Sequence, residues 1–194
     1  MQKLPRSFYT RKTSTVAKDL LGKILVRRMG RKILAGIIVE TEAYLFNDSA
    51  SHSFRGMTER NKVMFGKGGF LYVYFTYGMH YCANVVTFKE GIGEAVLIRA
   101  VEPKNGMKVM LKNRGLINER NLTKTTNGPA KLAQAFALTN EQSGTDLTGS
   151  EIFITSDETV PRSKIVTTTR IGISTAKEKK LRFYIKDNPW VSKK

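Results

Sequence analysis

The chain has 194 residues and carries 33 Lys and Arg side chains against 16 Asp and Glu, a net charge of +17. This length suits one domain over residues 1–194, and the single cysteine, Cys82, excludes an intramolecular disulfide. No stretch approaches the roughly 20 apolar residues of a membrane span, so we expect an intracellular protein. The charge alone fits a nucleic acid, an anionic membrane surface or an acidic protein partner equally well.

The N-terminal part is expected to form a helix followed by a strand hairpin. Residues 15–21 have the apolar spacing of a short amphipathic helix, with Ser14 as its N-cap and Gly22 as its stop. Residues 23–28 and 33–45 are rich in Ile, Leu and Val and are joined by a basic turn that contains a glycine. This pattern predicts two antiparallel strands.

A second hairpin is predicted over residues 70–88. Its two halves are rich in aromatic and β-branched residues, and Gly78 supplies the positive φ that a tight two-residue connection requires. Hairpin tips normally carry Asn, Asp or Ser, whereas here Tyr77 and Met79 flank the glycine. An apolar tip on a basic protein favours insertion into the base stack of a nucleic acid.

The C-terminal half alternates strands and helices without a regular βαβ order. We predict strands over residues 96–101, 165–173 and 181–185, and helices over residues 103–112 and 128–136. The expected fold is therefore α+β, with a largely antiparallel, curved sheet, surrounding helices and a protruding β-hairpin.

Two carboxylates share one face of the strand that ends near residue 45. Period-two alternation places Glu40, Glu42 and Tyr44 together on that face. Both acids could simply be solvated or paired with arginines, which is the commoner situation for strand carboxylates. The alternative is a carboxylate held back in a pocket to activate water. Tyr72 and Tyr74 also share a face, and they could either pack in the core or sandwich a flat ring.

Other candidate motifs carry less information. The two histidines, His52 and His80, lie in no ligand pattern with Cys82 or an acid, so metal catalysis and zinc-dependent base deamination are not expected. The glycines of residues 66–69 lack the Walker spacing, which indicates an ordinary turn. Lys131 in the first turn of the helix over residues 128–136 could contact a phosphate or could serve only in capping.

Ordered sequence blocks along nearly the whole chain resemble the alkyladenine (3-methyladenine) DNA glycosylase family. The blocks are Val39-Glu40-Thr41-Glu42-Ala43-Tyr44-Leu45, Arg60-Asn61, Leu71-Tyr72-Val73-Tyr74, Tyr77-Gly78-Met79, Asn84, Leu97-Ile98-Arg99-Ala100, Glu102-Pro103, Gly128-Pro129-Ala130-Lys131-Leu132, Leu181-Arg182-Phe183-Tyr184 and Pro189-Trp190-Val191-Ser192. The resemblance implies a monofunctional enzyme that flips damaged purines out of duplex DNA, hydrolyses the N-glycosidic bond and leaves an abasic site without cutting the strand.

The resemblance also implies roles for individual residues. Glu42 matches the glutamate that deprotonates the attacking water, and Arg99 matches an arginine that helps to position this water. The walls of the base pocket are matched by Tyr44, His52, Tyr74 and Asn84, and Asn84 matches an asparagine that screens out guanine. The stretch from Tyr44 to His52 is one residue shorter than in mammalian members, which leaves the place of His52 in the pocket open.

For DNA contact, Tyr77 matches the wedge that fills the gap left by the flipped nucleotide, and Met79 matches a neighbouring hairpin contact. Arg60 and Lys131 are further expected DNA contacts. The implied partner is double-stranded DNA containing damaged purines, with no cofactor, no metal and no membrane. We expect a monomer that is cytoplasmic and nucleoid-associated if the source is bacterial.

Two other classes of protein would share some of these features. A non-catalytic minor-groove protein could use Tyr77 to kink DNA, but it would gain nothing from Glu42 placed opposite phosphates. An RNA-binding accessory protein would discriminate through the 2′-hydroxyl and would be indifferent to base damage.

Overall fold

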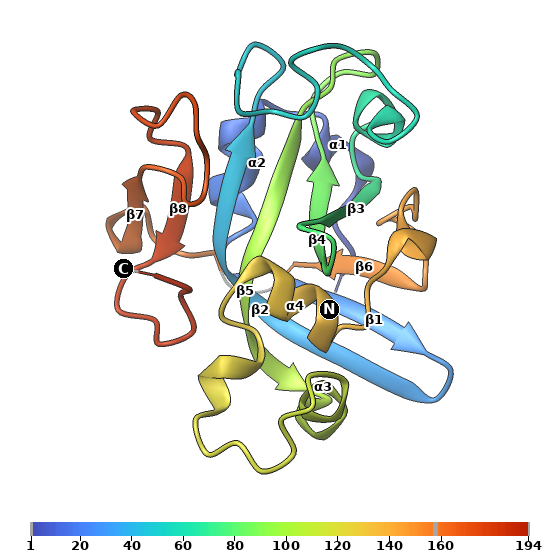
Figure 1. Ribbon diagram of the computed structural model, residues 1–194, viewed down its shortest axis with the longest axis vertical. Coiled ribbons are helices and arrows are strands. Elements are labelled where there is room, and N and C mark those ends of the chain that lie inside the picture. The colour runs from blue at the N-terminus through green and yellow to red at the C-terminus, as the bar shows by residue number, and fades with distance from the viewer. Residues whose placement is uncertain (1, 157–158, 194) are drawn as a thin grey trace.

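The computed structural model describes residues 2–156 and 159–193 and is built around one eight-stranded sheet (Figure 1). The strands are β1 (Ile24–Met29), β2 (Lys32–Tyr44), β3 (Leu71–Thr76), β4 (His80–Val86), β5 (Ala95–Asn105), β6 (Ile152–Thr155), β7 (Ile165–Thr168) and β8 (Arg182–Ile185). The α-helices are α1 (Arg6–Tyr9), α2 (Thr13–Asp19), α3 (Met107–Asn113) and α4 (Pro129–Ala135). Short 3₁₀ segments lie at η1 (Lys62–Phe65), η2 (Leu122–Thr125), η3 (Asn140–Gln142) and η4 (Arg162–Lys164).

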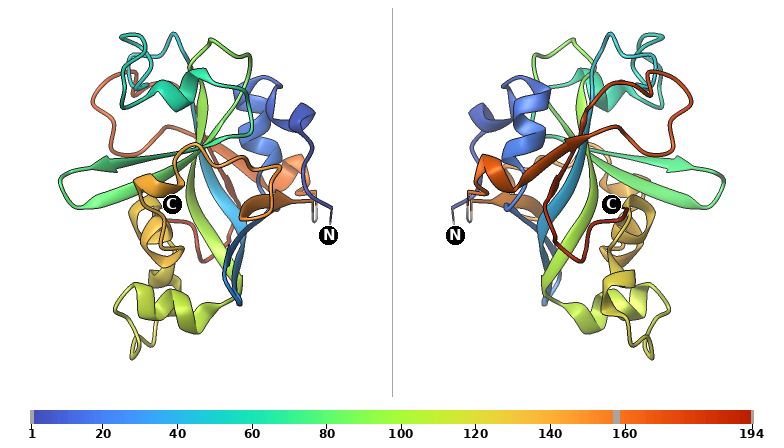
Figure 2. Two further views of the ribbon diagram at one scale, coloured as in Figure 1. Left: turned by 90° about the vertical axis from the view of Figure 1, so that its right-hand side faces the viewer. Right: turned by 90° about the vertical axis from the view of Figure 1, so that its left-hand side faces the viewer.

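The strand order is β3-β4-β5-β2-β1-β6, and β8 pairs with both β2 and β7. Every strand pairing that is described within residues 2–156 and 159–193 is antiparallel. The sheet curls, helices surround it and the β3–β4 hairpin extends from it (Figure 2). The predicted α+β class with a curved antiparallel sheet and a protruding hairpin is therefore confirmed.

Strand β2 organises the centre of this sheet. Along one edge it pairs with β5, and along the other it pairs first with β1 and then, from Glu40 to Glu42, with β8. The ladder between β2 and β5 shifts register on both sides of Glu40, which indicates a β-bulge at this point. Bulges bend a strand and re-aim its side chains. Both carboxylates are consequently delivered to the middle of the sheet, with paired strands on either side.

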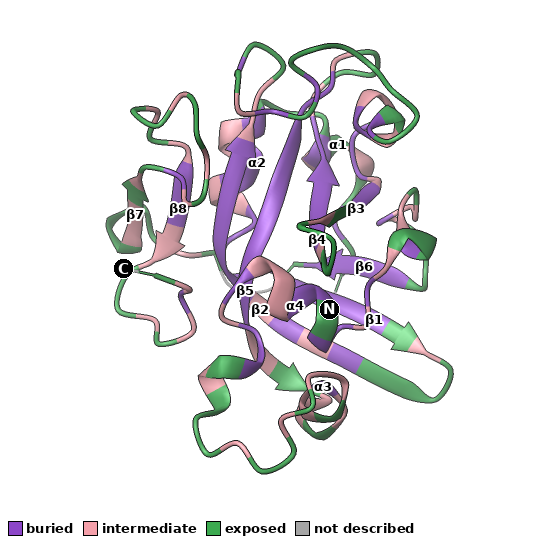
Figure 3. Ribbon diagram, viewed as in Figure 1, coloured by how far each residue is buried: buried purple, intermediate pink, exposed green. Residues whose placement is uncertain are grey.

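Helices cover both faces of the sheet, with α1 and α2 on one side and α3 and α4 on the other (Figure 2). The Thr41 hydroxyl donates to the Ala17 carbonyl at 2.8 Å, so Thr41 faces α2. Leu132 and Phe136 pack in the core below α4. Strands β1, β2, β4, β5 and β6 are buried over most of their length, whereas β7 is not, as Figure 3 shows. Because side chains alternate along β2, Glu40 and Glu42 point away from α2, on one shared face as predicted.

The β3–β4 hairpin lies where it was predicted, but its turn differs from the predicted two-residue connection. Thr76 pairs with His80, so three residues rather than two form the connection. Tyr77 itself has a φ of 52° and Gly78 has a φ of 66°. Tyr77 and Met79 are 81% and 70% exposed. A tyrosine therefore adopts a left-handed conformation at an apolar, exposed tip, where glycine or asparagine is the usual choice.

Two helix boundaries were predicted wrongly. Helix α2 begins at Thr13, its N-cap is Lys12, and Ser14 lies inside the helix. The helix expected from Pro103 instead starts at Met107, because Pro103 continues β5 opposite Gly36 and the chain leaves the strand at Gly106 with a φ of 83°. A Cβ on Gly36 would lie 2.9 Å from the Val101 side chain, so this close strand contact requires glycine.

Helix α1 and strand β6 were not predicted, and the strand expected over residues 165–173 ends at Thr168. Helix α1 explains the glycines of residues 66–69. Arg6 Nη1 donates to the Gly68 carbonyl at 2.9 Å, and a Cβ on Gly69 would lie 2.7 Å from the Tyr9 ring. This segment forms a turn packed against α1, which agrees with the turn prediction.

Candidate active site

A cavity of about 500 Å³ lies beside the N-terminal end of α4, where Pro129 forms part of its wall. Four strands of the sheet contribute side chains, and the remaining walls come from residues 49–52 and 171–175, together with Met64 and Tyr77. The strand residues are Tyr44, Tyr72, Tyr74, Thr76, Cys82, Asn84, Ala95, Leu97 and Arg99. A concave site of this size, with aromatic walls and a few polar groups, suits one small planar ligand.

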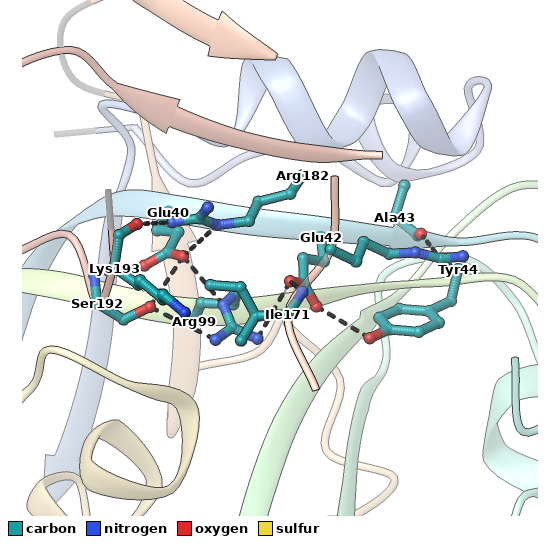
Figure 4. Close-up of polar contacts among 10 residues, drawn as sticks. Glu40, Glu42, Ala43, Tyr44, Arg99, Ile171, Arg182, Ser192 and Lys193 are labelled. Atoms are coloured by element: carbon teal, nitrogen blue, oxygen red, sulfur yellow. Dashed lines mark hydrogen bonds and ion pairs between the residues drawn. The ribbon is translucent and has the colours of Figure 1, made fainter. Parts of the chain in front are cut away.

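Glu42 lies directly behind this wall and is fully buried. Its Oε1 accepts the Ile171 backbone N–H at 2.8 Å and lies 3.2 Å from Arg99 Nη1, and its Oε2 accepts the Tyr44 hydroxyl at 2.9 Å (Figure 4). All three partner residues line the cavity. An ionised carboxylate offers about four acceptor positions, and these contacts occupy three of them. The Glu42 carboxylate is thus rigidly held and retains acceptor capacity on Oε2.

Tyr44 is fixed as a hydrogen-bond donor. Burial raises the pKa of Tyr44, and the Glu42 carboxylate beside it raises this pKa further. The phenol therefore stays protonated near neutral pH and holds its hydrogen bond to Glu42. Arg170 lies on the ring, with its guanidinium carbon 4.7 Å from the ring centroid.

Arg99 joins the two carboxylates of β2. Its Nε donates to Glu40 Oε1 at 3.0 Å, while Nη1 faces Glu42 (Figure 4). Burial acts to lower the pKa of Arg99, but Glu42 and Glu40 outweigh it and the pKa is raised. Glu40 also accepts from Arg182 Nε at 2.7 Å and from the Ser192 backbone N–H at 2.7 Å. Both acids are buried and paired with arginines, which is one of the two ordinary situations considered from the sequence.

An aromatic cluster forms the opposite part of the cavity. The rings of Tyr72 and Tyr74 stack with centroids 5.5 Å apart, and His52 meets Tyr74 edge-on at 4.4 Å. His52 Nδ1 lies 3.3 Å from the Tyr72 hydroxyl. His52 therefore lies in the cavity wall despite the shorter connection from Tyr44. Asn84 Nδ2 donates to the Tyr72 carbonyl at 3.1 Å, which ties this amide to the strand beside it.

Of the four residues expected to contact DNA, Tyr77 lines the cavity, whereas Arg60, Met79 and Lys131 do not. Tyr77 combines a highly exposed side chain with a place on the cavity rim. Arg60 donates to the Phe75 carbonyl at 2.7 Å and its guanidinium lies 5.8 Å from the Tyr74 ring centroid, so it adjoins the hairpin. Lys131 donates to Asn127 Oδ1 at 2.8 Å, a contact that fits the capping interpretation as well as a phosphate contact.

The segment of residues 171–175 was missed as part of the site. It was assigned in part to a strand, yet it follows β7 as an irregular loop, and its backbone donates to Glu42 through Ile171. Asp48 was missed as well. It forms a buried ion pair with Arg170, the residue directly before this loop. Only the Arg-Ile-Gly-Ile run, with a glycine in an apolar stretch, marked the loop in the sequence.

Neither a metal-ligand cluster nor a membrane-spanning helix is present in the part of the chain that the structure describes. Within residues 2–156 and 159–193, no three His, Cys, Asp or Glu side chains gather in a way that could hold a metal ion. In the same part of the chain, no helix is long and apolar enough to span a membrane.

Comparisons with known proteins give one consistent result. The sequence profile of the family described as methylpurine-DNA glycosylase matches residues 7–189. A protein of Carboxydothermus hydrogenoformans named "Putative 3-methyladenine DNA glycosylase" is 54% identical over 192 residues, covering 98% of this chain and 99% of the relative. Proteins with the same name from Methanoculleus marisnigri and Francisella tularensis are 48% and 50% identical, covering 98% and 94% of this chain and 99% and 95% of the relatives.

Proposed function

This chain belongs to the methylpurine-DNA glycosylase family and is a DNA N-glycosylase of base excision repair, and we propose that it hydrolyses the N-glycosidic bond of a flipped, damaged purine with a water activated by Glu42. The observation that carries this proposal is the position of Glu42. It is a buried carboxylate, fixed by Tyr44, Ile171 and Arg99, directly behind an aromatic cavity.

The cavity would hold the flipped base. Tyr44, His52 and Tyr74 offer aromatic rings, and stacking on such rings contributes about 1–3 kcal/mol per base. Extruding a nucleotide costs a few kcal/mol, and the cost is least for a damaged or mispaired base. Stacking and easier extrusion together favour damaged bases before any specific hydrogen bond forms. The proposed substrates are the 3-methyladenine, 7-methylguanine, hypoxanthine and etheno-adenine class, with Asn84 acting against guanine.

Glu42 would perform the chemistry through its Oε2. Hydrolysis of an N-glycosidic bond passes through a sugar with oxocarbenium character, so it requires an oriented water, a base that takes its proton, and negative charge near the developing cation. Arg99 and the Ile171 N–H engage Oε1, which orients the remaining acceptor position of Oε2 for a water. Arg99 would act as a positioning group, and Glu42 as the base.

The product would be an abasic site in an intact strand. A lyase step requires an amine that attacks the sugar carbon. No lysine is found among the cavity-lining residues in the part of the chain that the structure describes. In a bacterial cell the enzyme would act as a monomer on chromosomal DNA in the cytoplasm, at the nucleoid.

Single-turnover assays on duplexes that carry one hypoxanthine, etheno-adenine or methylated purine test the proposed function. We expect free base and an alkali-labile but uncut strand, without added metal. Tight lesion-independent binding with no released base would instead support the non-catalytic DNA-kinking protein. Release that needs an added metal ion, or that cuts the strand, would contradict the proposed mechanism.

DNA affinity should depend steeply on salt. With a net charge of +17, the protein should displace condensed counterions from several phosphates. Binding to an undamaged duplex should weaken by about 10²-fold to 10⁵-fold between 50 and 200 mM salt. Fluorescence anisotropy at several salt concentrations measures this slope. A flat salt response would contradict phosphate contacts as the main source of affinity.

Acidification should weaken the binding of cationic lesions through His52. Desolvation in the cavity lowers the pKa of His52 below its ordinary value of 6.5, and Arg60 lowers it further. The imidazole is then neutral at pH 7, and protonation on moving below this lowered pKa adds a positive charge beside the base. The affinity ratio between a 7-methylguanine duplex and a hypoxanthine duplex should therefore fall as the pH drops below 6.5 and through the lowered pKa of His52. The same ratio should stay level in His52→Gln, and parallel curves for both proteins would exclude His52 as the titrating group.

A further inference from the structure

A buried ion pair, Asp48–Arg170, lies next to the cavity and has no part in the proposed chemistry. Arg170 Nη1 lies 2.5 Å from Asp48 Oδ2, and both side chains are fully buried. Asp48 belongs to the loop that follows β2, whereas Arg170 lies in the segment between β7 and β8. The pair therefore joins two parts of the chain that are distant in sequence.

Stability alone does not account for this pair. Removing two charges from water is expensive, and a buried ion pair repays this cost only when further hydrogen bonds satisfy its remaining atoms. Arg170 Nε and Nη2 have no hydrogen-bond partner among the residues that the structure describes. Apolar side chains of similar volume would be about as stable at such a position. The presence of a buried ion pair at this position therefore points to a role in fixing the geometry of the neighbouring segments.

Each member of the pair contacts one wall of the cavity. Arg170 donates to the Ala43 carbonyl at 3.1 Å and lies on the outer face of the Tyr44 ring, and the next residue, Ile171, donates to Glu42 at 2.8 Å. Asp48 Oδ1 accepts the Ala50 N–H at 3.2 Å, in the wall of residues 49–52 that leads to His52. The ion pair thus fixes the spacing between the two walls.

We propose that Asp48 and Arg170 are positioning residues, which clamp the two cavity walls together and thereby set the Ile171 N–H on Glu42 and the Tyr44 ring against the base. This proposal rests on the proposed function. Loss of the pair would let residues 171–175 shift, and Glu42 would lose one of the contacts that orient it. A misplacement of about 1 Å can reduce a reaction rate by about 100-fold. The base-release step should suffer more than lesion affinity.

Variants Asp48→Asn, Arg170→Met and the double variant test this proposal. Asp48→Asn leaves the buried Arg170 guanidinium without its carboxylate, and Arg170→Met leaves Asp48 with only the Lys179 ammonium at 3.9 Å. Each single variant should therefore unfold at a lower temperature, whereas the double variant removes both charges and should recover most of the loss. Single-turnover base release should remain about 10-fold to 100-fold slow in all three proteins, with lesion affinity changed less than about threefold. A purely structural pair would instead give a release rate that recovers together with stability.

A matched pair provides the control. Arg6 and Asp146 also form an ion pair at 2.5 Å, but their side chains are 33% and 40% exposed and neither lines the cavity. The Arg6→Met, Asp146→Asn double variant should release base at the wild-type rate. Arg170→Lys adds a test that keeps the charge: one ammonium cannot reproduce the guanidinium contacts to Asp48, Ala43 and the Tyr44 ring, so release should again be slow.

Two results would overturn the proposal. One is a wild-type release rate in the double variant Asp48→Asn, Arg170→Met once its stability has recovered, and the other is a wild-type release rate in Arg170→Lys. Failure of the wild-type protein to release any lesion base would be a different result, because it would refute the proposed function itself. The wild-type assay is therefore run first.

Discussion

Replacing Glu42 with Gln should slow single-turnover base release by about 10²-fold to 10⁴-fold, the range attributed to a general base, while lesion affinity stays near the wild-type value. Gln has the same size and its amide oxygen can still accept the Ile171 N–H. It cannot take a proton from water or offset positive charge on the sugar. Binding is expected to persist because the aromatic cavity and the hairpin remain intact.

Glu40→Gln is the matched control for this experiment. It makes the same substitution two residues away, in the same buried network with Arg99. Of the three residues that hold Glu40, namely Arg99, Arg182 and Ser192, only Arg99 lines the cavity, whereas all three partners of Glu42 line it, so the main effect should be a lower unfolding temperature. Release by folded Glu40→Gln should stay well above release by Glu42→Gln. Equal release rates in the two variants would contradict the assignment of Glu42 as the general base and Glu40 as a structural acid.

Replacing Tyr77 with Ala should reduce release from duplex DNA by about 5-fold to 150-fold, which corresponds to about 1–3 kcal/mol of lost stacking. Tyr77 is 81% exposed at the hairpin tip and also lies on the cavity rim. A side chain in this place can fill the gap beside the nucleotide that enters the cavity. The defect should appear in the flipping equilibrium, which the fluorescence of an adjacent base analogue reports.

Two further substitutions separate the wedge from the turn. Tyr77 has a φ of 52°, so Tyr77→Gly relieves backbone strain, and the unfolding temperature should stay level or rise while activity falls. Tyr77→Phe keeps the ring and should retain most of the activity. An unchanged flipping equilibrium in Tyr77→Ala, or full activity in Tyr77→Gly, would refute insertion of this side chain.

The local features of the fold could be predicted because they depend on neighbours in sequence. Alternation along residues 33–45 placed Glu40 and Glu42 on one face, and the structure shows both carboxylates in contact with Arg99. Glycine and aromatic patterning likewise located the β3–β4 hairpin. The roles of these residues in the site came from the resemblance to the glycosylase family, because alternation alone left Glu42 as either a paired acid or a water-activating base.

The long-range contacts could not be predicted from residue patterns. Ile171 reaches Glu42 across 129 positions and Ser192 reaches Glu40 across 152 positions, and no periodicity encodes such pairs. The ion pair of Asp48 with Arg170 depends in the same way on tertiary packing. Pro103 gave the opposite error, because its suitability for a helix start was overridden by the close contact of β5 with Gly36.

One measurement tests the central claim most directly: stopped-flow fluorescence of a duplex with a single etheno-adenine, mixed with wild-type protein or with Glu42→Gln, combined with quenched assays of free base. The account predicts the same early fluorescence change for both proteins, since both flip the base into the cavity, followed by base release from the wild type alone. Release by Glu42→Gln at the wild-type rate would contradict it, because another group would then have to activate the water.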